Sequence, residues 1–110
     1  MRSVELFSGC GGLALGTARA GFEHAKMVEW NADACATLAY NKAKGVEHAR
    51  DWPFMQGDVR AINWSEIGGE LSLVAGGPPC QPFSIGGKHK GNNDARDMWP
   101  EAIRAVRELR

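Results

Sequence analysis

The 110-residue sequence lacks the features that mark several whole classes of protein. No apolar run approaches the roughly 20 residues that a membrane helix needs, which argues against a membrane protein. The amino terminus carries an early acid, Glu5, and only a short apolar stretch, so we expect no signal peptide. Internal repeats and low-complexity segments are also missing. The formal net charge is zero, with 13 Lys and Arg against 13 Asp and Glu. This balance argues against a nucleic-acid binder that works by bulk electrostatics, but not against one with a local basic loop.

Cysteine and histidine are scarce, and neither residue type forms a recognisable site. The three cysteines, Cys10, Cys35 and Cys80, are widely spaced without a Cys-x-x-Cys pair, which indicates neither a disulfide framework nor a zinc site. We therefore expect no bound metal and a reducing, cytoplasmic environment. Cys35 is expected to be a small buried hydrophobe. The sequence holds no serine-hydrolase elbow and no His-Glu-x-x-His, and we expect its scattered histidines at the surface: His24, His48 and His89.

What the sequence does have is the composition of one soluble globular domain, with 44% hydrophobic and 24% charged residues. We expect strands at residues 4–7, 26–29 and 71–75, and a weak third strand running from residues 53–55 into Gly57, Asp58 and Val59. We expect helices at residues 13–20, 62–67 and 98–109, and one that is capped by Asn31 or Asp33 and buries Ala34, Leu38 and Ala39. Strands that alternate with helices pair in parallel through right-handed crossovers. The expected fold is therefore an open, mostly parallel α/β sheet flanked by helices, in which ligands bind beyond the carboxyl ends of the strands.

The first expected strand runs into a glycine-rich turn that opens a helix. The turn comprises Phe7, Ser8, Gly9, Cys10, Gly11 and Gly12. Glycines let the backbone approach a ligand closely, and the start of a helix offers it free N–H groups, so we expect the backbone of Cys10 to matter more than its thiol. The pattern departs from G-x-G-x-x-G, although Ala14 could replace the third glycine, which keeps an NAD-binding domain open as an alternative. Taken alone, the turn is also compatible with a tight connection that binds nothing.

Two further strand ends carry side chains that suit a nucleoside. Glu29 ends the second strand, where a carboxylate is placed to accept hydrogen bonds from both hydroxyls of a ribose. Trp30 beside it offers a flat face to a purine, and Asp58 after the third strand offers an acceptor to an exocyclic amine. Read singly, these residues are a surface acid, a half-buried core tryptophan and an Asp turn. Together they fall in the order that a nucleoside lying across the sheet needs, which favours a nucleoside cofactor.

The fourth strand end is the most specific stretch of the sequence. Residues 76–84 read Gly-Gly-Pro-Pro-Cys-Gln-Pro-Phe-Ser. Two glycines and three prolines constrain the backbone around Cys80. A nucleophile needs such a scaffold because its sulfur must be held at a defined distance from the reacting atom. The alternative is a rigid turn with an incidental cysteine.

These segments together resemble the amino-terminal part of a cytosine-5 DNA methyltransferase. The match consists of Glu-Leu-Phe-Ser-Gly-Cys-Gly-Gly at residues 5–12, the pairs at 29–30 and 57–58, the stretch at 76–84, and Gly-Gly-Lys-His-Lys-Gly and Asp-Ala-Arg after it. The resemblance implies a Rossmann-like S-adenosylmethionine-dependent methyltransferase fold, incomplete at about four strands. It divides a single partial catalytic domain into a cofactor floor at 1–75, a cysteine loop at 76–97 and a trailing helix at 98–110. It also implies a role in DNA methylation and restriction-modification, in a bacterial cytoplasm or nucleoid.

The resemblance implies a role for each site residue. Cys80 would attack carbon 6 of a cytosine flipped out of the duplex, which makes carbon 5 nucleophilic enough to take the methyl group. Residues 84–96 would form the family's loop that closes over DNA, the alternative being a solvated surface loop. The contacts to double-stranded DNA would come from Gln81, Ser84, Lys88, Lys90 and Arg96. S-adenosylmethionine would be held by Phe7, Ser8, Gly9, Cys10, Gly11, Gly12, Glu29, Trp30, Asp58, Val59 and Pro79.

The resemblance also has gaps. The family's Glu-Asn-Val segment, whose glutamate protonates cytosine N3, does not occur in these 110 residues. We therefore expect a fragment or split subunit that is inactive alone. The strand at 71–74 is apolar on both faces, so we expect its outer edge to be exposed and to pair with a complementary chain or a second copy. The alternatives are a non-catalytic S-adenosylmethionine-binding or interaction module, an NAD-binding Rossmann domain, and an enzyme that acts on RNA, since RNA-methylating relatives share the Pro-Pro-Cys sequence.

Overall fold

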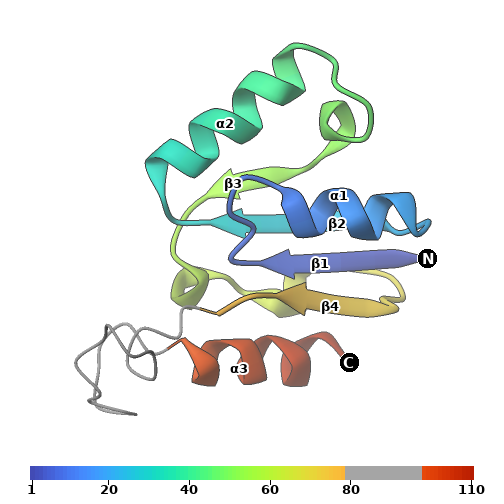
Figure 1. Ribbon diagram of the computed structural model, residues 1–110. Coiled ribbons are helices and arrows are strands. Elements are labelled where there is room, and N and C mark those ends of the chain that lie inside the picture. Colours follow the sequence, from blue (N-terminus) through green and yellow to red (C-terminus); the bar gives the residue numbers. More distant parts are fainter. Residues whose placement is uncertain (79–97) are drawn as a thin grey trace.

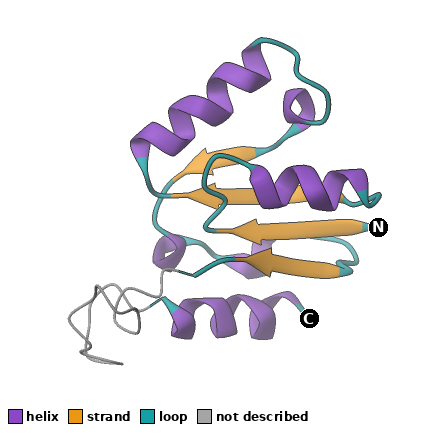
Figure 2. Ribbon diagram, viewed as in Figure 1, coloured by secondary structure: helices purple, strands orange, loops and turns teal. Residues whose placement is uncertain are grey.

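A computed structural model describes residues 1–78 and 98–110 of the chain. These residues form four strands and three helices, which alternate except that only short 3-10 turns separate the third strand from the fourth (Figures 1 and 2). The strands are β1 (Arg2–Leu6), β2 (Glu23–Glu29), β3 (Phe54–Gln56) and β4 (Leu73–Gly76). The helices are α1 (Gly12–Arg19), α2 (Ala32–Ala43) and α3 (Trp99–Leu109), and three single 3-10 turns are η1 (Ala49–Asp51), η2 (Val59–Ala61) and η3 (Trp64–Glu66).

The strands form one parallel sheet in the order β3-β2-β1-β4. β1 lies between β2 and β4, with Glu5 opposite Met27 on one side and Ala75 on the other. All four carboxyl ends therefore lie along one edge of the sheet, on the left of Figure 1. This arrangement confirms the predicted open α/β sheet.

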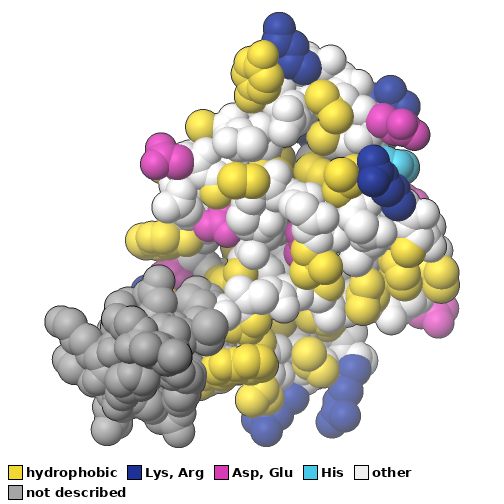
Figure 3. Space-filling model, in the orientation of Figure 1, with side chains coloured by type: hydrophobic (Ala, Val, Ile, Leu, Met, Phe, Trp, Pro, Cys, Tyr) yellow, Lys and Arg dark blue, Asp and Glu magenta, His cyan; other side chains and the backbone are white. Residues whose placement is uncertain are grey.

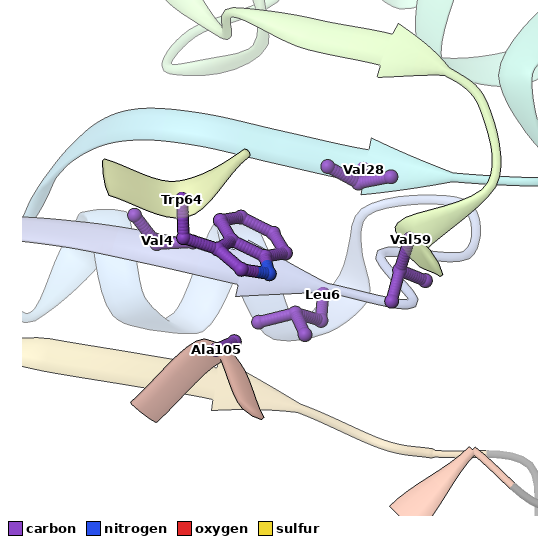
Figure 4. Packing of buried hydrophobic residues seen from close by; sticks show 6 residues of the cluster. All are labelled: Val4, Leu6, Val28, Val59, Trp64 and Ala105. Atoms are coloured by element: carbon purple, nitrogen blue, oxygen red, sulfur yellow. The ribbon is translucent and has the colours of Figure 1, made fainter. Parts of the chain in front are cut away.

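One face of the sheet packs against α3 and the two turns that follow β3. Val4, Leu6 and Val28 contribute side chains from β1 and β2 to this core, and Trp64 from η3 is fully buried among them. Figure 4 shows the indole of Trp64 lying over the strands, with Ala105 of α3 near it and Leu6 between it and Val59 of η2. The packing of Trp64 thus joins α3 to the sheet.

The opposite face of the sheet is covered by α1, α2 and η1. Ala14, Met27, Leu38 and Ala49 form this core together with Trp52, whose side chain is only 5% exposed. The ring of His24 meets the ring of Trp52 edge-on, with 6.0 Å between centroids. The prediction of a surface His24 was therefore wrong, because α1 and Trp52 cover the start of β2.

Several local predictions need correction. The third strand is shorter and earlier than expected: it ends at Gln56, and Asp58 starts a 3-10 turn because its side chain accepts from the N–H of Arg60. The expected helix at 62–67 is a single turn, η3. In α2, Asn31 is the cap, and Cys35 is buried as predicted, whereas Ala39 is exposed. Within the described residues, no helix has the length and apolar character needed to cross a membrane.

Candidate functional site

The candidate site lies where the chain leaves β1, β2 and β3 at the carboxyl edge of the sheet. The glycine-rich turn, Glu29 with Trp30, and Asp58 all follow directly from these strands. β4 ends at the same edge, with Gly76 so close to β1 that a Cβ atom there would lie 2.6 Å from the carbonyl oxygen of Leu6. The structure thus gathers at one edge the residues that the sequence placed at successive strand ends.

The turn after β1 has an unusual backbone. Phe7, Gly9 and Gly11 all have positive φ angles, of 55°, 58° and 98°. For a bulky residue such as Phe7 this conformation is uncommon and costs about 1–3 kcal/mol, a type of strain that concentrates at functional sites. α1 begins at Gly12 without a side-chain cap, so the first N–H groups of the helix are available to a ligand.

Glu29 ties the glycine-rich turn to the start of α2. Its Oε1 accepts from the N–H of Gly9 at 2.8 Å, and its Oε2 accepts from the N–H of Asn31 at 2.7 Å. Each carboxylate oxygen keeps a second lone pair for another donor. The carboxylate is therefore held in place by two backbone groups and can still accept hydrogen bonds from a diol.

Trp30 borders a hollow beside this carboxylate. The hollow has a volume of about 360 Å³ and is lined by Trp30, Asn31, Ala32, Gln56 and Gly57. Trp30 is 67% exposed, which excludes the alternative that it is a half-buried core residue. A flat, exposed indole beside a hollow suits a planar aromatic ligand. Asn31 was predicted only as a helix cap and Gln56 was not singled out at all, because a lone amide carries no pattern that indicates a binding site.

Asp58 is engaged by its own neighbour Arg60. Its carboxylate accepts from the N–H of Arg60 at 2.9 Å and from the Nη2 of Arg60 at 2.6 Å. The side-chain hydrogen bond from Arg60 holds the pKa of Asp58 below its usual range. The Asp turn considered as an alternative is thus present. Because an exposed ion pair contributes only about 0–1 kcal/mol, a ligand amine can replace a bond from Arg60 at little cost.

Two charged residues near the site were not predicted from the sequence. Glu5 lies in the middle of β1 and is only 1% exposed, and burial raises its pKa to about 7. Arg104 of α3 donates to the backbone carbonyls of Val59 and Ile62 on either side of η2. The sequence signal that could have identified Glu5 is its position as an acid within a strand that is otherwise expected to be buried. No local sequence pattern indicates the contacts of Arg104.

The remaining predicted site residues lie outside the described part of the chain. They are the cofactor residue Pro79, the nucleophile Cys80, and the DNA-contacting Gln81, Ser84, Lys88, Lys90 and Arg96. His89 also falls in this segment. The described chain reaches Pro78, two residues after the end of β4.

The family model of C-5 cytosine-specific DNA methylases matches residues 1–110. The chain belongs to this family. C-5 cytosine-specific DNA methylases use S-adenosylmethionine as their methyl donor, in agreement with the predicted nucleoside cofactor.

Curated relatives of this chain are type II methyltransferases. M.NgoMIV of Neisseria gonorrhoeae is 44% identical over 106 residues, which are 96% of this chain and 31% of the relative. M.AquIA of Picosynechococcus is 40% identical over 113 residues, covering 96% of this chain and 43% of the relative. The chain thus spans less than half the length of these relatives.

Solved structures show the same fold as this chain. A structure described as a DNA modification methyltransferase encoded within an E. coli prophage matches 99% of the chain with a TM-score of 0.73 and 32% identity, over 29% of its own length. The glycopeptide N-methyltransferase MtfA matches with a TM-score of 0.62 at 18% identity, which concerns the fold alone. The four-stranded sheet is therefore part of a Rossmann-like methyltransferase fold.

Proposed function

We propose that this chain provides the cofactor seat and the nucleophile of an enzyme that transfers a methyl group from S-adenosylmethionine to carbon 5 of cytosine in DNA. The observation that carries the proposal is the convergence of the glycine-rich turn, Glu29, Trp30 and Asp58 at one sheet edge. β4 ends at that same edge and leads directly toward Pro79 and Cys80 in the sequence.

The cofactor seat follows from the contacts at this edge. Glu29, fixed by the N–H groups of Gly9 and Asn31, accepts hydrogen bonds from the ribose hydroxyls. Trp30 packs on the adenine, and the turn at Asp58 and Val59 meets the adenine edge. The backbone from Phe7 to Gly12 surrounds the rest of the molecule, and Pro79 is a further cofactor-binding residue. When bound there, the cofactor supplies an electrophilic methyl group on a sulfonium.

Cys80 makes the cytosine reactive. Its thiolate adds to carbon 6 of a flipped-out base, and the electrons of the carbon 5–carbon 6 double bond shift into the ring. Carbon 5 then attacks the methyl carbon, and the carbon–sulfur bond of the sulfonium breaks to leave S-adenosylhomocysteine. Loss of the carbon 5 proton to a base restores the double bond and expels the Cys80 thiolate. Gln81, Ser84, Lys88, Lys90 and Arg96 contact the DNA around this base, the three cations at phosphates.

A further segment or chain completes the enzyme. An acid that protonates the ring nitrogen typically contributes about 10²–10⁴-fold to such a step, and no Glu-Asn-Val occurs in these 110 residues to supply it. We infer that residues 1–110 alone are inactive.

β4 pairs only with β1 within the described part of the chain. Ile103 and Val106 of α3 are half exposed, and hydrophobic side chains gather at the surface near α3 (Figure 3). This edge and helix face are where the completing chain, or failing that a second copy, would pack.

Two measurements test the proposal. Calorimetry should detect binding of S-adenosylhomocysteine and no binding of NAD, and Glu29→Ala should weaken the former by about 10–100-fold, since a hydrogen bond to a charged group contributes about 1.5–3 kcal/mol. Methyl transfer to DNA by the complete protein should yield 5-methylcytosine, and Cys80→Ala should abolish it. Binding of NAD alone would support a Rossmann dehydrogenase domain, binding without transfer a non-catalytic module, and transfer only to RNA an RNA-methylating enzyme.

The state of the isolated chain is tested separately. Ultracentrifugation of residues 1–110 should detect self-association that is suppressed when the complementary segment is added. A monodisperse, cooperatively stable monomer would contradict the proposed docking edge. The cytoplasmic location stays a prediction.

A further inference from the structure

Arg104 connects α3 to the turn that carries Asp58. Its Nη2 donates to the carbonyl oxygen of Val59 at 2.9 Å, and its Nη1 donates to the carbonyl oxygen of Ile62 at 3.1 Å. These two carbonyls lie at the start of η2 and just after its end. One guanidinium therefore spans the whole turn that begins immediately after Asp58.

The guanidinium is itself held in a fixed orientation by two carboxylates of α3. Its Nε donates to Glu101 at 2.8 Å and its Nη1 donates to Glu108 at 2.9 Å. The hydrogen bond that Arg104 donates to Glu101 raises the pKa of the guanidinium further above its already high value. A planar fork with several donors can serve four acceptors at once, which a lysine ammonium on a flexible stem cannot reproduce.

The turn η2 is also held by the hydrophobic core. Val59 is buried in the same core cluster as Trp64 and as Ala105, the residue that follows Arg104, with Leu6 lying between Val59 and these two side chains (Figure 4). Asp58 lies at the start of the same turn, where its side chain accepts hydrogen bonds from the exposed Arg60. The position of the Asp58 backbone is thus set by α3, and α3 directly follows the segment that contains Cys80.

We propose that Arg104 is a positioning residue for adenine recognition: it holds η2 so that the carboxylate of Asp58 meets the exocyclic amine of the cofactor. This inference rests on the proposed function, since it takes S-adenosylmethionine as the ligand of the site. It also provides a physical link between the cofactor turn and the helix that trails the nucleophile segment.

The test compares two ligands that differ only at the amine-bearing edge of the purine. In the complete protein, dissociation constants are measured for S-adenosylhomocysteine and for S-inosylhomocysteine, in which an oxo group replaces the amine and the neighbouring ring nitrogen carries a proton. The parent protein should prefer the adenosyl compound by about tenfold or more, the contribution of one hydrogen bond to a charged acceptor. Arg104→Gln should remove most of this preference, by weakening the adenosyl compound about tenfold while changing the inosyl compound little. Arg104→Lys should not restore it.

Controls separate positioning from general destabilisation. Arg107→Gln changes an exposed arginine of the same helix and should leave the preference intact. In an Asp58→Asn background, Arg104→Gln should have no further effect on the preference. Equal weakening of both ligands, or an unchanged preference in Arg104→Gln, would overturn the inference while leaving the proposed function in place. If the parent protein binds neither ligand, the proposed function itself fails and the inference with it.

Discussion

The indole ring of Trp52 packs directly beneath Gly11, the residue that precedes α1 in the glycine-rich turn. A Cβ atom on Gly11 would lie 2.6 Å from Cζ3 and 3.0 Å from Cη2 of this ring, and 3.0 Å from Leu38. Gly11 also has a φ of 98°. Both facts require glycine at this position. The core that contains Trp52 and Leu38 therefore fixes the position of the glycine-rich turn that is proposed to surround the cofactor.

Gly11→Ala is expected to destabilise the protein by about 2–4 kcal/mol, because it combines left-handed backbone strain with overpacking against Trp52. Urea unfolding measures the change. Gly16→Ala is the matched control, since Gly16 lies inside α1 with no atom within 4 Å of an added Cβ. It should be neutral or stabilise by up to about 1 kcal/mol. Similar free energies for the two variants would contradict the close contact between Gly11 and Trp52.

Trp30→Ala is expected to weaken S-adenosylhomocysteine binding by about 5–100-fold without lowering the free energy of unfolding, since stacking on an aromatic side chain contributes about 1–3 kcal/mol per base. Calorimetry measures the affinity, and urea unfolding measures the free energy of unfolding. Tyr40→Ala removes another exposed aromatic, 63% exposed on α2 and away from the hollow, and should leave affinity unchanged. Unaltered binding in Trp30→Ala would remove the tryptophan from the site.

Glu5 should make stability fall as the pH rises. Burial raises its pKa from 4.5 to about 7, so between these values the folded chain keeps a proton that the unfolded chain has lost. The stabilisation that comes from this retained proton is fully present below pH 4.5, and about 3 kcal/mol of it is lost by pH 7 to 8. The Glu5→Gln side chain does not titrate. The free energy of unfolding of the parent minus that of Glu5→Gln should therefore decline as the pH rises through this range.

The comparison with Glu5→Gln is needed because His24 acts in the opposite direction. Burial lowers the pKa of His24, so its contribution to stability is lost as the pH falls below the ordinary histidine range. His24 is present in both proteins, and its effect cancels in the difference. Parallel pH profiles for the parent and Glu5→Gln would show that the Glu5 carboxyl is solvated in the folded state.

The sequence predicts the parts of this fold that depend on local patterns. The four strands and three main helices lie near their predicted positions, because short apolar runs bounded by glycine indicate them directly. β3 was misplaced because its three residues carry little periodic signal, and the capping bond of Asp58 ends the extended segment early. The burial of His24 depends on Trp52, 28 positions away, which no local pattern indicates.

The candidate site divides in the same way. Glu29, Trp30 and Asp58 were found because strand ends in parallel sheets share one edge. The bonds that fix them are mostly non-local: Gly9 to Glu29 spans 20 positions, and Arg104 to Val59 spans 45. A charged residue in an amphipathic helix is ordinarily solvated, so only the three-dimensional arrangement distinguishes Arg104 from Arg107.

The central claim is that Cys80 forms a covalent bond with the cytosine that is methylated. The most direct measurement incubates the complete protein and S-adenosylmethionine with DNA that contains 5-fluorocytosine at its target position. Fluorine at carbon 5 blocks the loss of a proton that releases the enzyme, so a protein–DNA adduct that survives denaturation should accumulate and map to Cys80 by mass spectrometry. Cys80→Ala should give none. Methylation of carbon 5 without an adduct, or an adduct that persists in Cys80→Ala, would contradict the account.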